Sequence, residues 1–385
     1  MKKVIVLGST GSIGRNTLEV IRNNPKRFKV VGLSSAKNIK LLRRQVKEFR
    51  PSYVSILDKE RARDFKFRGI KLLKGEEGLY ELSQKECDFL ILGIPGLSAL
   101  RPLWFCLGKA KRVLLANKEA IISAGNLIKQ KLKKTSTEFF PIDSEAWAML
   151  NLLRTQNRKN ISCIYITASG GPFWDKPKKE MRKATLKDVL KHPVWKMGKK
   201  ISVDSAILIN KGFEVIEIKR LFNFPTKKIK VLIHPQSVVH ALLERKDRTT
   251  LAFMFSPDMR IPISSGLGAN NFLRHKSLSL KEMMNLDFFE PDYQRFPALK
   301  LAYFVGEREK SYPTVLVASD EEAVNLYLKD QINFYDIFKI IEKVIEVHTP
   351  KEVTSLKDIF YWQAWAKEKV RELVSKKRCL RFSFV

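Results

Sequence analysis

Short apolar stretches alternate with amphipathic stretches of helix length over the first part of the chain. Val4–Leu7 is a run of apolar residues, and Ile13–Asn23 has the spacing of an amphipathic helix. Because strands separated by helices form parallel sheets with right-handed crossovers, this alternation predicts a doubly wound α/β domain. The further elements expected here are strands at Val30–Leu33, Tyr53–Leu57, Asp88–Leu92 and Val113–Ala116, and a helix at Ile39–Phe49.

The pattern changes after the apolar strand Phe139–Ile142. Ile161–Ala168 and Lys230–Leu243 are predicted to be strands of a second sheet with helices between them, whereas the chain from Phe296 onward is almost purely helical in its spacing. The expected helices are Ala298–Gly306, Asp320–Lys329, Tyr335–His348 and Leu356–Lys376. We therefore expect domains at residues 1–145, 146–263 and 296–385, joined by a linker at 264–295.

Cysteine usage and apolar run lengths narrow the class of protein. The four cysteines lie far apart and form no CxxC pair, so we expect reduced thiols and a cytoplasmic location. The longest apolar run, Phe89–Leu100, contains glycine and proline and is too short for a membrane span, so no membrane partner is expected. Because the chain opens directly into a strand pattern, no leader peptide is expected.

The formal net charge of +32 has two explanations. It would attract anionic partners such as nucleic acid, a membrane surface or a phosphorylated substrate. Alternatively, it reflects a general use of lysine on solvated surfaces. The lysines are scattered over the whole length rather than gathered in one tail. This distribution favours the second explanation, and we expect no nucleic-acid partner.

A glycine-rich turn follows the first predicted strand. Gly8, Gly11 and Gly14 stand between that strand and the first helix, which is the context of a dinucleotide-binding turn. A glycine turn without a ligand is the alternative. At the end of the second strand, Ser34–Asn38 offers hydroxyls, a lysine and an amide but no acid. Because NAD enzymes usually carry an acid there, the sequence favours NADP(H).

Two carboxylates follow the strand that ends near Ile142. Asp143 and Glu145 alternate along an extended segment and so point the same way. Two carboxylates side by side suit a cation, and oxygen ligands favour Mg²⁺ or Mn²⁺. The alternative is that they cap the helix that starts near Ala146. A third carboxylate, such as Glu214, would favour the metal.

Three further clusters offer groups that bind anions. Thr167–Pro172 is a strand-to-glycine turn, and Ser202–Ser205 leads into a helix on which Asn210 and Glu214 share one face. Between them, residues 189–199 form a polar loop that displays a tryptophan and a methionine, which is typical of a lid over a ligand. The alternative is a tryptophan that only anchors this loop to the core.

Taken together, these segments resemble the 1-deoxy-D-xylulose 5-phosphate reductoisomerase family. The resemblance rests on segments that keep the family's order and approximate spacing over nearly the whole chain: GSTGSIG from Gly8, LLANKEAII from Leu114, PIDSEAW from Pro141, TASGGPF from Thr167, HPVWKMGKKISVDSA from His192, INKGFEVIE from Ile209, IHPQSVVH from Ile233 and PDMRIPI from Pro257. It implies a Rossmann-like NADPH domain (1–145), a central catalytic domain (146–263) with a flexible flap (189–199), and a C-terminal helical domain (296–385) in a homodimer.

The resemblance also implies roles for individual residues. The metal ligands would be Asp143, Glu145 and Glu214, and the residues at the reacting centre would be Glu145, Lys118, Asp143 and His192. The substrate would be held by Lys118, Ser144, Glu145, Ser169, His192, Trp195, Met197, Ser205, Asn210, Lys211 and Glu214. NADPH would be held by Thr10, Gly11, Ser12, Ile13, Lys37, Asn38, Asn117, Glu119 and Gly198.

The implied activity is the NADPH- and metal-dependent conversion of 1-deoxy-D-xylulose 5-phosphate to 2-C-methyl-D-erythritol 4-phosphate for isoprenoid synthesis, with Mg²⁺ or Mn²⁺ and with Co²⁺ as a further option. Two segments depart from the family's pattern, Ser264–His275 and Val317–Glu321, and the basic C-terminus from Lys376 has no counterpart. The alternatives are a dehydrogenase of the semialdehyde or homoserine type, or a basic nucleic-acid-binding protein.

Overall fold

The computed structural model describes residues 1–195, 197–269, 278–279 and 285–382, with side chains up to residue 376. The chain divides into two compact units. Unit 1 comprises Met1–Ala120, Ile128–Trp147 and Asp258–Ser277, and unit 2 comprises Ile121–Leu127, Ala148–Pro257 and Leu278–Val385. Lys196 in the predicted flap, much of the predicted linker, and the last three residues of the basic C-terminus lie outside the described residues.

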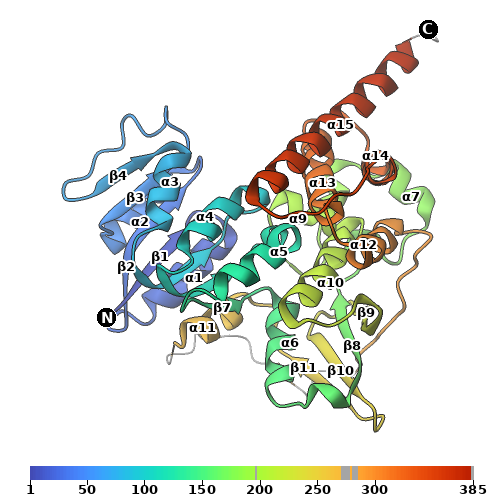
Figure 1. Cartoon of the computed structure of the whole chain (residues 1–385), viewed down its shortest axis with the longest axis horizontal. Coiled ribbons are helices and arrows are strands. Elements are labelled where there is room, and N and C mark those ends of the chain that lie inside the picture. Colours follow the sequence, from blue (N-terminus) through green and yellow to red (C-terminus); the bar gives the residue numbers. More distant parts are fainter. Residues whose placement is uncertain (196, 270–277, 280–284, 383–385) are drawn as a thin grey trace. The chain divides into compact units, whose positions relative to one another are not determined.

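Unit 1 is built on a seven-stranded sheet in the order β4-β3-β2-β1-β5-β6-β7, and every neighbouring pair is parallel. The strand order reverses between β1 and β5, so the crossovers place helices on both faces (Figure 1). The predicted doubly wound parallel sheet is confirmed. Its strands are β1 (Lys2–Leu7), β2 (Phe28–Ser35), β3 (Tyr53–Ile56), β4 (Lys71–Lys74), β5 (Cys87–Leu92), β6 (Ala110–Leu115) and β7 (Glu138–Pro141).

The helices of unit 1 bury one face against this sheet. The amphipathic helix α1 turns Leu18, Val20 and Ile21 inward, and helix α11, far away in sequence, packs on α1. Arg260 of α11 bonds Glu19 of α1 at 2.5 Å. The elements are α1 (Ser12–Arg22), α2 (Ile39–Phe49), α3 (Gly75–Ser83), α4 (Leu100–Cys106) and α11 (Arg260–Leu267), with parts of α5 (Lys118–Leu132) and α6 (Ser144–Arg154). Residues 258–267, which we divided between the central domain and the linker, are thus grouped with unit 1.

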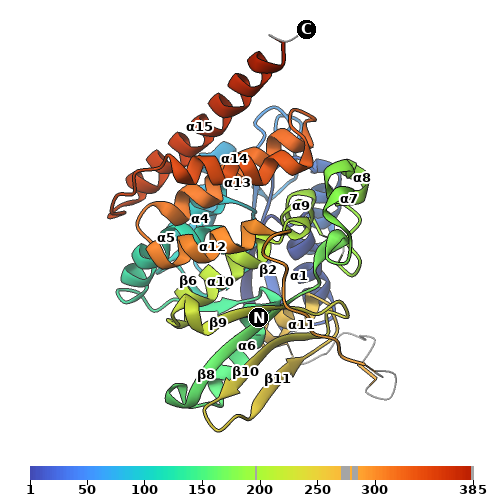
Figure 2. The ribbon, with the colours of Figure 1, turned by 90° about the vertical axis from the view of Figure 1, so that its right-hand side faces the viewer.

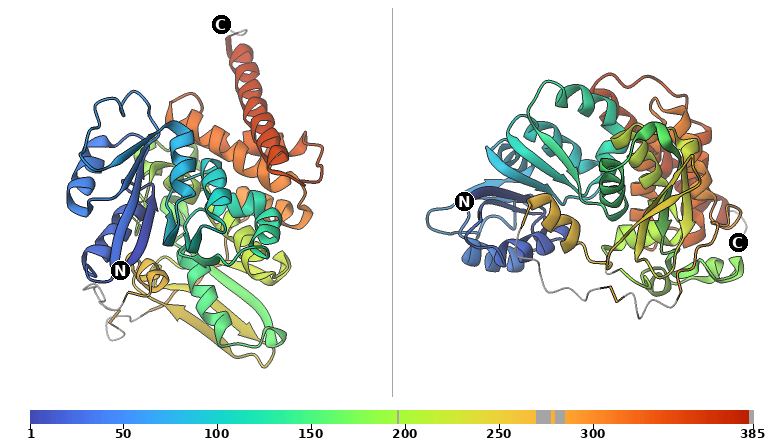
Figure 3. Two further views of the ribbon diagram at one scale, coloured as in Figure 1. Left: turned by 60° about the vertical axis from the view of Figure 1, so that its left-hand side comes forward. Right: turned by 90° about the horizontal axis from the view of Figure 1, so that it is seen from below.

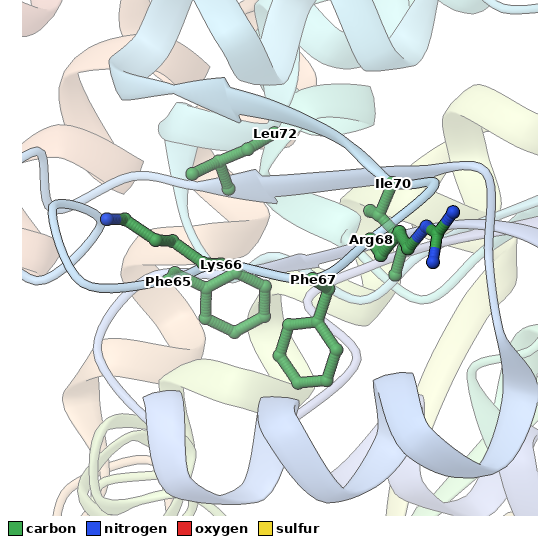
Figure 4. Close-up of a pocket in the computed structure, with 6 residues that line it drawn as sticks. All are labelled: Phe65, Lys66, Phe67, Arg68, Ile70 and Leu72. Carbon is green, nitrogen blue, oxygen red and sulfur yellow. The ribbon is translucent and has the colours of Figure 1, made fainter.

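The connection between β3 and β4 forms a shallow cavity of about 420 Å³. Figure 4 shows the rings of Phe65 and Phe67 pointing the same way, with Lys66 and Arg68 directed elsewhere. Arg43 of α2 lies 5.0 Å and 5.8 Å from the centroids of these two rings. Cation–π contact with one arginine therefore fastens this connection to α2.

Unit 2 contains a four-stranded sheet in the order β11-β10-β8-β9. Its strands are β8 (Ile161–Ala168), β9 (Ile229–Ile233), β10 (Val239–Arg245) and β11 (Thr250–Met254). The single strand predicted at Lys230–Leu243 is wrong. It is two strands, β9 and β10, separated by a turn in which Ser237 has a φ of 51°. Strand β9 pairs parallel with β8, whereas β10 pairs antiparallel with it.

Helices make up the rest of unit 2. Helix α10 contacts both β9 and α12, and α12–α15 pack side by side beyond it (Figure 2). The predicted helix Asp320–Lys329 begins earlier, at Tyr312, and helix α15 extends past its neighbours (Figure 3). The helices are α7 (Lys178–Lys183), α8 (Leu186–Val189), α9 (Lys199–Ala206), α10 (Ile209–Phe222), α12 (Pro297–Arg308), α13 (Tyr312–Leu328), α14 (Phe334–Glu346) and α15 (Leu356–Phe382).

Close contact between α10 and α12 depends on glycine. A Cβ on Gly212 would lie 2.3 Å from the Cβ of Ala302, and one on Gly306 would lie 3.2 Å from Cγ1 of Ile216 in α10. The helix that carries Lys211 and Glu214 is therefore seated tightly on its neighbour. Over the described residues, no helix is long and apolar enough to cross a membrane.

A buried histidine gives unit 2 a pH dependence. His348 is 4% exposed, bonds the Ser311 hydroxyl at 2.8 Å and packs edge-on against Trp362. Burial lowers its pKa to about 4. The unfolded chain binds this proton near pH 6.5, so we expect stability to be lost as pH falls from about 6.5 to about 4. The urea midpoint, followed by tryptophan fluorescence against pH, measures this loss.

The His348→Gln variant isolates this contribution, because His192 and His234 also have lowered pKa values through burial and act in the same direction. Glutamine can still bond Ser311 but does not titrate. The pH slope of the urea midpoint should be shallower in the variant, whatever its absolute stability. An unchanged slope would show that His348 is not the group responsible.

Candidate active site

The glycine turn lies at the carboxyl end of β1, where the strand order reverses. Gly8 has a φ of 81°, and a Cβ there would lie 2.6 Å from the carbonyl oxygen of Gly93 after β5. A Cβ on Gly14 would lie 2.4 Å from the carbonyl oxygen of Gly8. Only glycine fits these two places. Gly11 is the N-cap of α1 and provides no side-chain cap, so the N–H groups of the first turn are available to an anion.

The end of β2 supports this turn. The Ser34 hydroxyl accepts a hydrogen bond from the Gly8 N–H at 2.8 Å, and Ser35 and Thr10 share a hydroxyl–hydroxyl bond of 2.8 Å. Lys37 and Asn38 are exposed, and Asn38 caps α2 by accepting from the Leu41 N–H. The serines therefore build the turn, while the lysine stands at the exposed start of α2.

Asn117 and Glu119 position a neighbouring loop. The Asn117 side chain caps α5 and donates to the carbonyl oxygens of Ile94 and Gly96 at 3.0 and 2.9 Å. Glu119 accepts from the Gly96 N–H at 3.1 Å. Both side chains are buried. They hold the loop after β5 that meets Gly8, which is a positioning role beside the expected cofactor site.

Asp143, Glu145 and Lys118 come together at the ends of β6 and β7. The Lys118 ammonium lies 2.9 Å from Asp143 Oδ2, and their side chains are only 9% and 14% exposed. A carboxylate oxygen of Asp143 and one of Glu145 lie within 4.8 Å. The Ser144 hydroxyl donates to Glu145 Oε2 at 2.5 Å. Among the described residues, Asp143 Oδ1 is buried without a hydrogen-bond partner.

This geometry bears on the helix-capping alternative. Asp143 does meet the start of α6, but through its backbone carbonyl oxygen, which accepts from the Trp147 N–H at 2.8 Å. Its carboxylate is turned to Lys118 instead. A buried carboxylate oxygen without a donor is costly unless a cation or a water molecule satisfies it. The donor set, two carboxylates with an open oxygen, fits a hard divalent cation.

In unit 2, helix α10 presents a second polar cluster near its start. Asn210 Nδ2 donates to Glu214 Oε1 at 2.6 Å, and Lys211 forms an ion pair with the other oxygen of Glu214. Lys211 and Glu214 are 5% and 2% exposed. Leu208 begins the helix in the left-handed conformation, with a φ of 59°. An ion pair this deeply buried is weak evidence for stability and a candidate for function.

Ser169 and His192 meet through a bond whose direction can be assigned. His192 Nδ1 accepts from the Val194 and Trp195 N–H groups at 3.2 and 2.8 Å. The ring proton therefore sits on Nε2, which donates to the Ser169 hydroxyl oxygen at 2.9 Å. Burial lowers the pKa of His192 to about 4, so the ring is neutral at physiological pH. The Ser169 O–H is left to donate to a ligand.

The predicted flap lies against the four-stranded sheet through its tryptophan. The Trp195 ring meets His240 of β10 edge-on, with centroids 6.2 Å apart, and Trp195 and Met197 are both half-buried. Gly198 begins α9 with no neighbour within 4 Å of its Cβ position. The Trp195 ring therefore anchors the loop to the sheet, which was the alternative interpretation of this residue. A loop anchored by one ring can still act as a lid.

Ser205 lies where the turn after β8 approaches α9. A Cβ on Gly171 would meet the carbonyl oxygen of Ser205 at 2.7 Å. Near its start, helix α9 is bound to α13 by Lys200, which bonds Asp320 of α13 at 2.5 Å. The same ammonium bonds Asp204 of α9 at 2.6 Å. Asp320 stands in one of the two segments that depart from the expected pattern. Here it holds the helix that follows the flap.

The sequence did not identify the lysines of a cavity next to His192. This cavity, of about 750 Å³, is lined partly by Gly171, Trp174 and His192, and by four basic residues, Lys176, Lys179, Lys183 and Lys191. The lysine-rich stretch Lys176–Lys183 was the available signal, but lysines are so frequent in this chain that it did not stand out. Three acidic residues, Asp175, Glu180 and Asp188, line the same cavity, so its lining keeps only a small excess of positive charge.

Comparison with known proteins places these observations in one family. The family model for 1-deoxy-D-xylulose 5-phosphate reductoisomerase matches residues 4–125, the model for its C-terminal domain matches residues 139–222, and a second C-terminal model, for DXP reductoisomerase, matches residues 254–369. These models span the glycine turn, both polar clusters, the flap and most of the C-terminal helices.

Curated relatives named 1-deoxy-D-xylulose 5-phosphate reductoisomerase are similar over nearly the whole chain. One from Caldanaerobacter subterraneus subsp. tengcongensis is 42% identical over 376 residues, covering 96% of this chain and 98% of the relative. One from Thermodesulfovibrio yellowstonii is 41% identical over 381 residues, covering 98% and 100%.

Solved structures of this family are similar to the fold. The Zymomonas mobilis enzyme in complex with NADPH has a TM-score of 0.87 at 36% identity, covering 97% of this chain and 99% of that one. A DOX-P reductoisomerase in complex with NADPH, fosmidomycin and magnesium has a TM-score of 0.89 at 31% identity, covering 98% and 99%.

Proposed function

The chain belongs to the 1-deoxy-D-xylulose 5-phosphate reductoisomerase family, and from that premise we propose that Asp143, Glu145 and Glu214 are its metal ligands. The enzyme is an NADPH- and divalent-metal-dependent oxidoreductase that converts 1-deoxy-D-xylulose 5-phosphate to 2-C-methyl-D-erythritol 4-phosphate in isoprenoid precursor synthesis. The semialdehyde or homoserine dehydrogenase alternative and the nucleic-acid-binding alternative are not favoured, since the family matches extend over both units.

The observation that carries the metal assignment is Asp143. Its Oδ1 is buried without a partner among the described residues, Glu145 is adjacent, and Lys118 balances only part of the negative charge. Glu214 contributes a third carboxylate that is 2% exposed. A divalent cation bound there would act as a Lewis acid on the substrate's carbonyl and adjacent hydroxyl oxygens. Mg²⁺ is the cation bound in three related structures, and Mn²⁺ or Co²⁺ would suit the same oxygens.

Lys118 and Glu145 are proposed to act at the reacting centre. Lys118 is 7% exposed and fixed by its ion pair with Asp143, so its ammonium can orient a substrate oxygen. Glu145 accepts a hydrogen bond from Ser144, and its second carboxylate oxygen can accept a proton from a substrate hydroxyl as the carbon skeleton rearranges. NADPH held at the glycine turn of Gly8, Gly11 and Gly14 would supply the hydride that reduces the rearranged aldehyde.

Substrate and cofactor contacts are proposed for the remaining polar residues. Ser169 donates its O–H, and the neutral His192 holds it in place, so the pair suits one anionic or hydroxyl group of the substrate. Lys211 supplies positive charge. The further substrate contacts are Ser144, Ser205, Asn210, Glu214, Trp195 and Met197, and the NADPH contacts are Thr10, Gly11, Ser12, Ile13, Lys37, Asn38, Asn117, Glu119 and Gly198.

Domain roles, assembly and location belong to the same proposal. The NADPH domain at 1–145, the catalytic domain at 146–263 with its flap at 189–199, the linker at 264–295 and the helical domain at 296–385 stay predictions. Strand β11 lies at one edge of the four-stranded sheet, so its outer backbone N–H and C=O groups can pair with a strand of a second copy. This position supports a homodimer. A cytoplasmic location is supported by the buried free thiols Cys87, Cys106 and Cys163.

The assay of choice follows NADPH absorbance with 1-deoxy-D-xylulose 5-phosphate as substrate. Wild-type protein should oxidise NADPH only when Mg²⁺ or Mn²⁺ is present. Glu145→Gln removes the proton acceptor and should lower kcat by about 10²- to 10⁴-fold at saturating metal. Glu138→Gln, on the exposed face of β7, is the control and should keep wild-type turnover. Near-normal turnover in Glu145→Gln would remove its assigned role.

A further inference from the structure

A second polar cavity lies in unit 2, away from the residues assigned above. It has a volume of about 290 Å³ and lies between α5, the end of α10, the turn that joins α12 to α13, and the segment at Glu352 and Val353. This volume is near the lower end of the range for ligand pockets, about 300 to 1,000 Å³. The cavity would therefore admit a small molecule and not a nucleotide.

Arg220 of α10 is the central group of this cavity. Its stem packs on α5, where a Cβ on Gly125 would lie 2.9 Å from Arg220 Cδ. Its Nη1 donates to Asn126 Oδ1 at 2.7 Å and to Glu309 Oε2 at 3.1 Å. The side chain is only 8% exposed. Glycine at 125 and the two acceptors thus hold a buried guanidinium in one place.

Two residues that line the cavity each carry a buried polar atom that has no partner among the described residues. These atoms are Arg220 Nε, which can only donate, and the hydroxyl of Ser123, a residue that is 7% exposed. Burial also lowers the pKa of Arg220. Such atoms carry a desolvation cost unless something accepts their protons. Both call for an acceptor atom, and an oxyanion supplies several.

The charged residues around the cavity favour an anionic ligand. Three basic residues line it, Arg220, Arg308 and Lys310, against two acidic ones, Glu309 and Glu352. Glu309 is already paired, since it also bonds Lys219, and Glu352 pairs with Lys310 at 3.5 Å. Arg308 and Lys310 are exposed, so they stand at the entrance rather than in the wall. The lining therefore keeps a net positive charge around two unsatisfied donors.

We propose that this cavity binds a phosphate-type oxyanion, either inorganic phosphate or the phosphate of a small monoester. Arg220 Nε and the Ser123 hydroxyl would donate to its oxygens, and Arg308 and Lys310 would draw it in. None of these residues has a place in the reaction proposed above. The site is therefore separate from the substrate's own phosphate subsite and would stand if the metal assignment failed.

Calorimetric titration of the full chain with inorganic phosphate tests the proposal. The double variant Arg308→Gln, Lys310→Gln and the single variant Ser123→Ala should each lose one phosphate-binding event or weaken it by about tenfold. The control Lys300→Gln, Lys329→Gln removes two exposed lysines of unit 2 that do not line the cavity. This control changes the net charge equally and should bind phosphate as the wild type does.

Two results would overturn the proposal. One is phosphate binding that stays unchanged in both cavity variants, which would mean that the cavity holds only water. The other is an equal loss in the control, which would mean that the effect is net charge alone. The four charged positions are exposed, Ser123→Ala removes only a hydroxyl, and circular dichroism verifies that all the variants fold. Repeating the titration with glycerol 3-phosphate distinguishes free phosphate from a phosphate monoester. The compound with the lower Kd identifies which of the two the cavity binds.

Discussion

Asp143→Asn is expected to lower kcat/KM for NADPH-dependent turnover by about 10³-fold or more, because it replaces a charged metal ligand by an amide. The change also leaves Lys118 without the carboxylate that lies 2.9 Å from its ammonium. The loss should be partly recovered at high metal concentration if it arises from weaker metal binding. Steady-state rates over a Mn²⁺ series, with Mn²⁺ binding followed by electron paramagnetic resonance, measure both effects.

Asp88→Asn is a closely matched control. Asp88 is also in unit 1, its side chain is 15% exposed against 14% for Asp143, and its partner Lys111 lies at the same distance of 2.9 Å. The two variants thus lose an ion pair of the same length from an equally exposed carboxylate, although Lys111 is 76% exposed and Lys118 only 9%. Only Asp143 belongs to the proposed metal site. Equal Mn²⁺ affinity in the two variants would contradict the assignment of Asp143, whatever the turnover.

Gly14→Ala is expected to weaken NADPH binding by about 100-fold, because the added Cβ would lie 2.4 Å from the Gly8 carbonyl oxygen and from Ser9 Cα. Both neighbours are backbone atoms and cannot rotate away, so the turn must shift and its N–H groups leave their positions. Overpacking of this kind costs about 1–3 kcal/mol of stability. Fluorescence titration of NADPH and the thermal midpoint measure the two effects separately.

Gly69→Ala separates this clash from a general effect of replacing glycine. Gly69 is also in unit 1 and has a φ of 76°, but nothing lies within 4 Å of its Cβ position. The variant should lose about 1 kcal/mol of stability through its backbone conformation and keep wild-type NADPH affinity. If Gly14→Ala bound NADPH within threefold of wild type, the glycine turn would not be the pyrophosphate site.

The C-terminal helices show how a departure in sequence can be absorbed by the fold. Asp320 is fully buried in α13, where an acid alone would be costly. Lys200 reaches it from α9 and bonds Asp204 with the same ammonium. The departing segment therefore fixes α9, which begins at Lys199, the last residue of the flap, and does not loosen the unit.

Local patterns in the sequence determined the first half of the fold well. Helix α2 begins and ends at the predicted residues, and β8 does so too. The glycine turn was predicted because strand, glycine spacing and helix follow one another within a few residues, so the physical constraint is local. The choice of NADP(H) was also local, and the family comparisons support it.

Where the prediction failed, pairing or packing at long range decided the outcome. Lys230–Leu243 has apolar residues near both ends, and Pro235 between them was the local signal of a turn that the prediction missed. The pairing of β9 and β10 on opposite sides of β8 requires this turn. The short strand β4 was not predicted, because its four residues, Lys-Leu-Leu-Lys, are too few to show a strand pattern and become a strand by pairing with β3.

The candidate site likewise has features that the sequence predicted and features that only the tertiary structure decided. The sequence identified Asp143 and Glu145 as a pair but left metal binding and helix capping equally open. Only the tertiary structure turned the Asp143 carboxylate toward Lys118 and left one of its oxygens buried without a donor. The neutral state of His192 follows likewise from backbone N–H groups and burial, which no spacing along the chain encodes. The sequence by itself determined the types of the site residues and their order along the chain. The protonation states of the site residues, their burial and their partners far away in the chain were decided by tertiary packing. These properties depend on which parts of the chain come into contact and exclude water from the site.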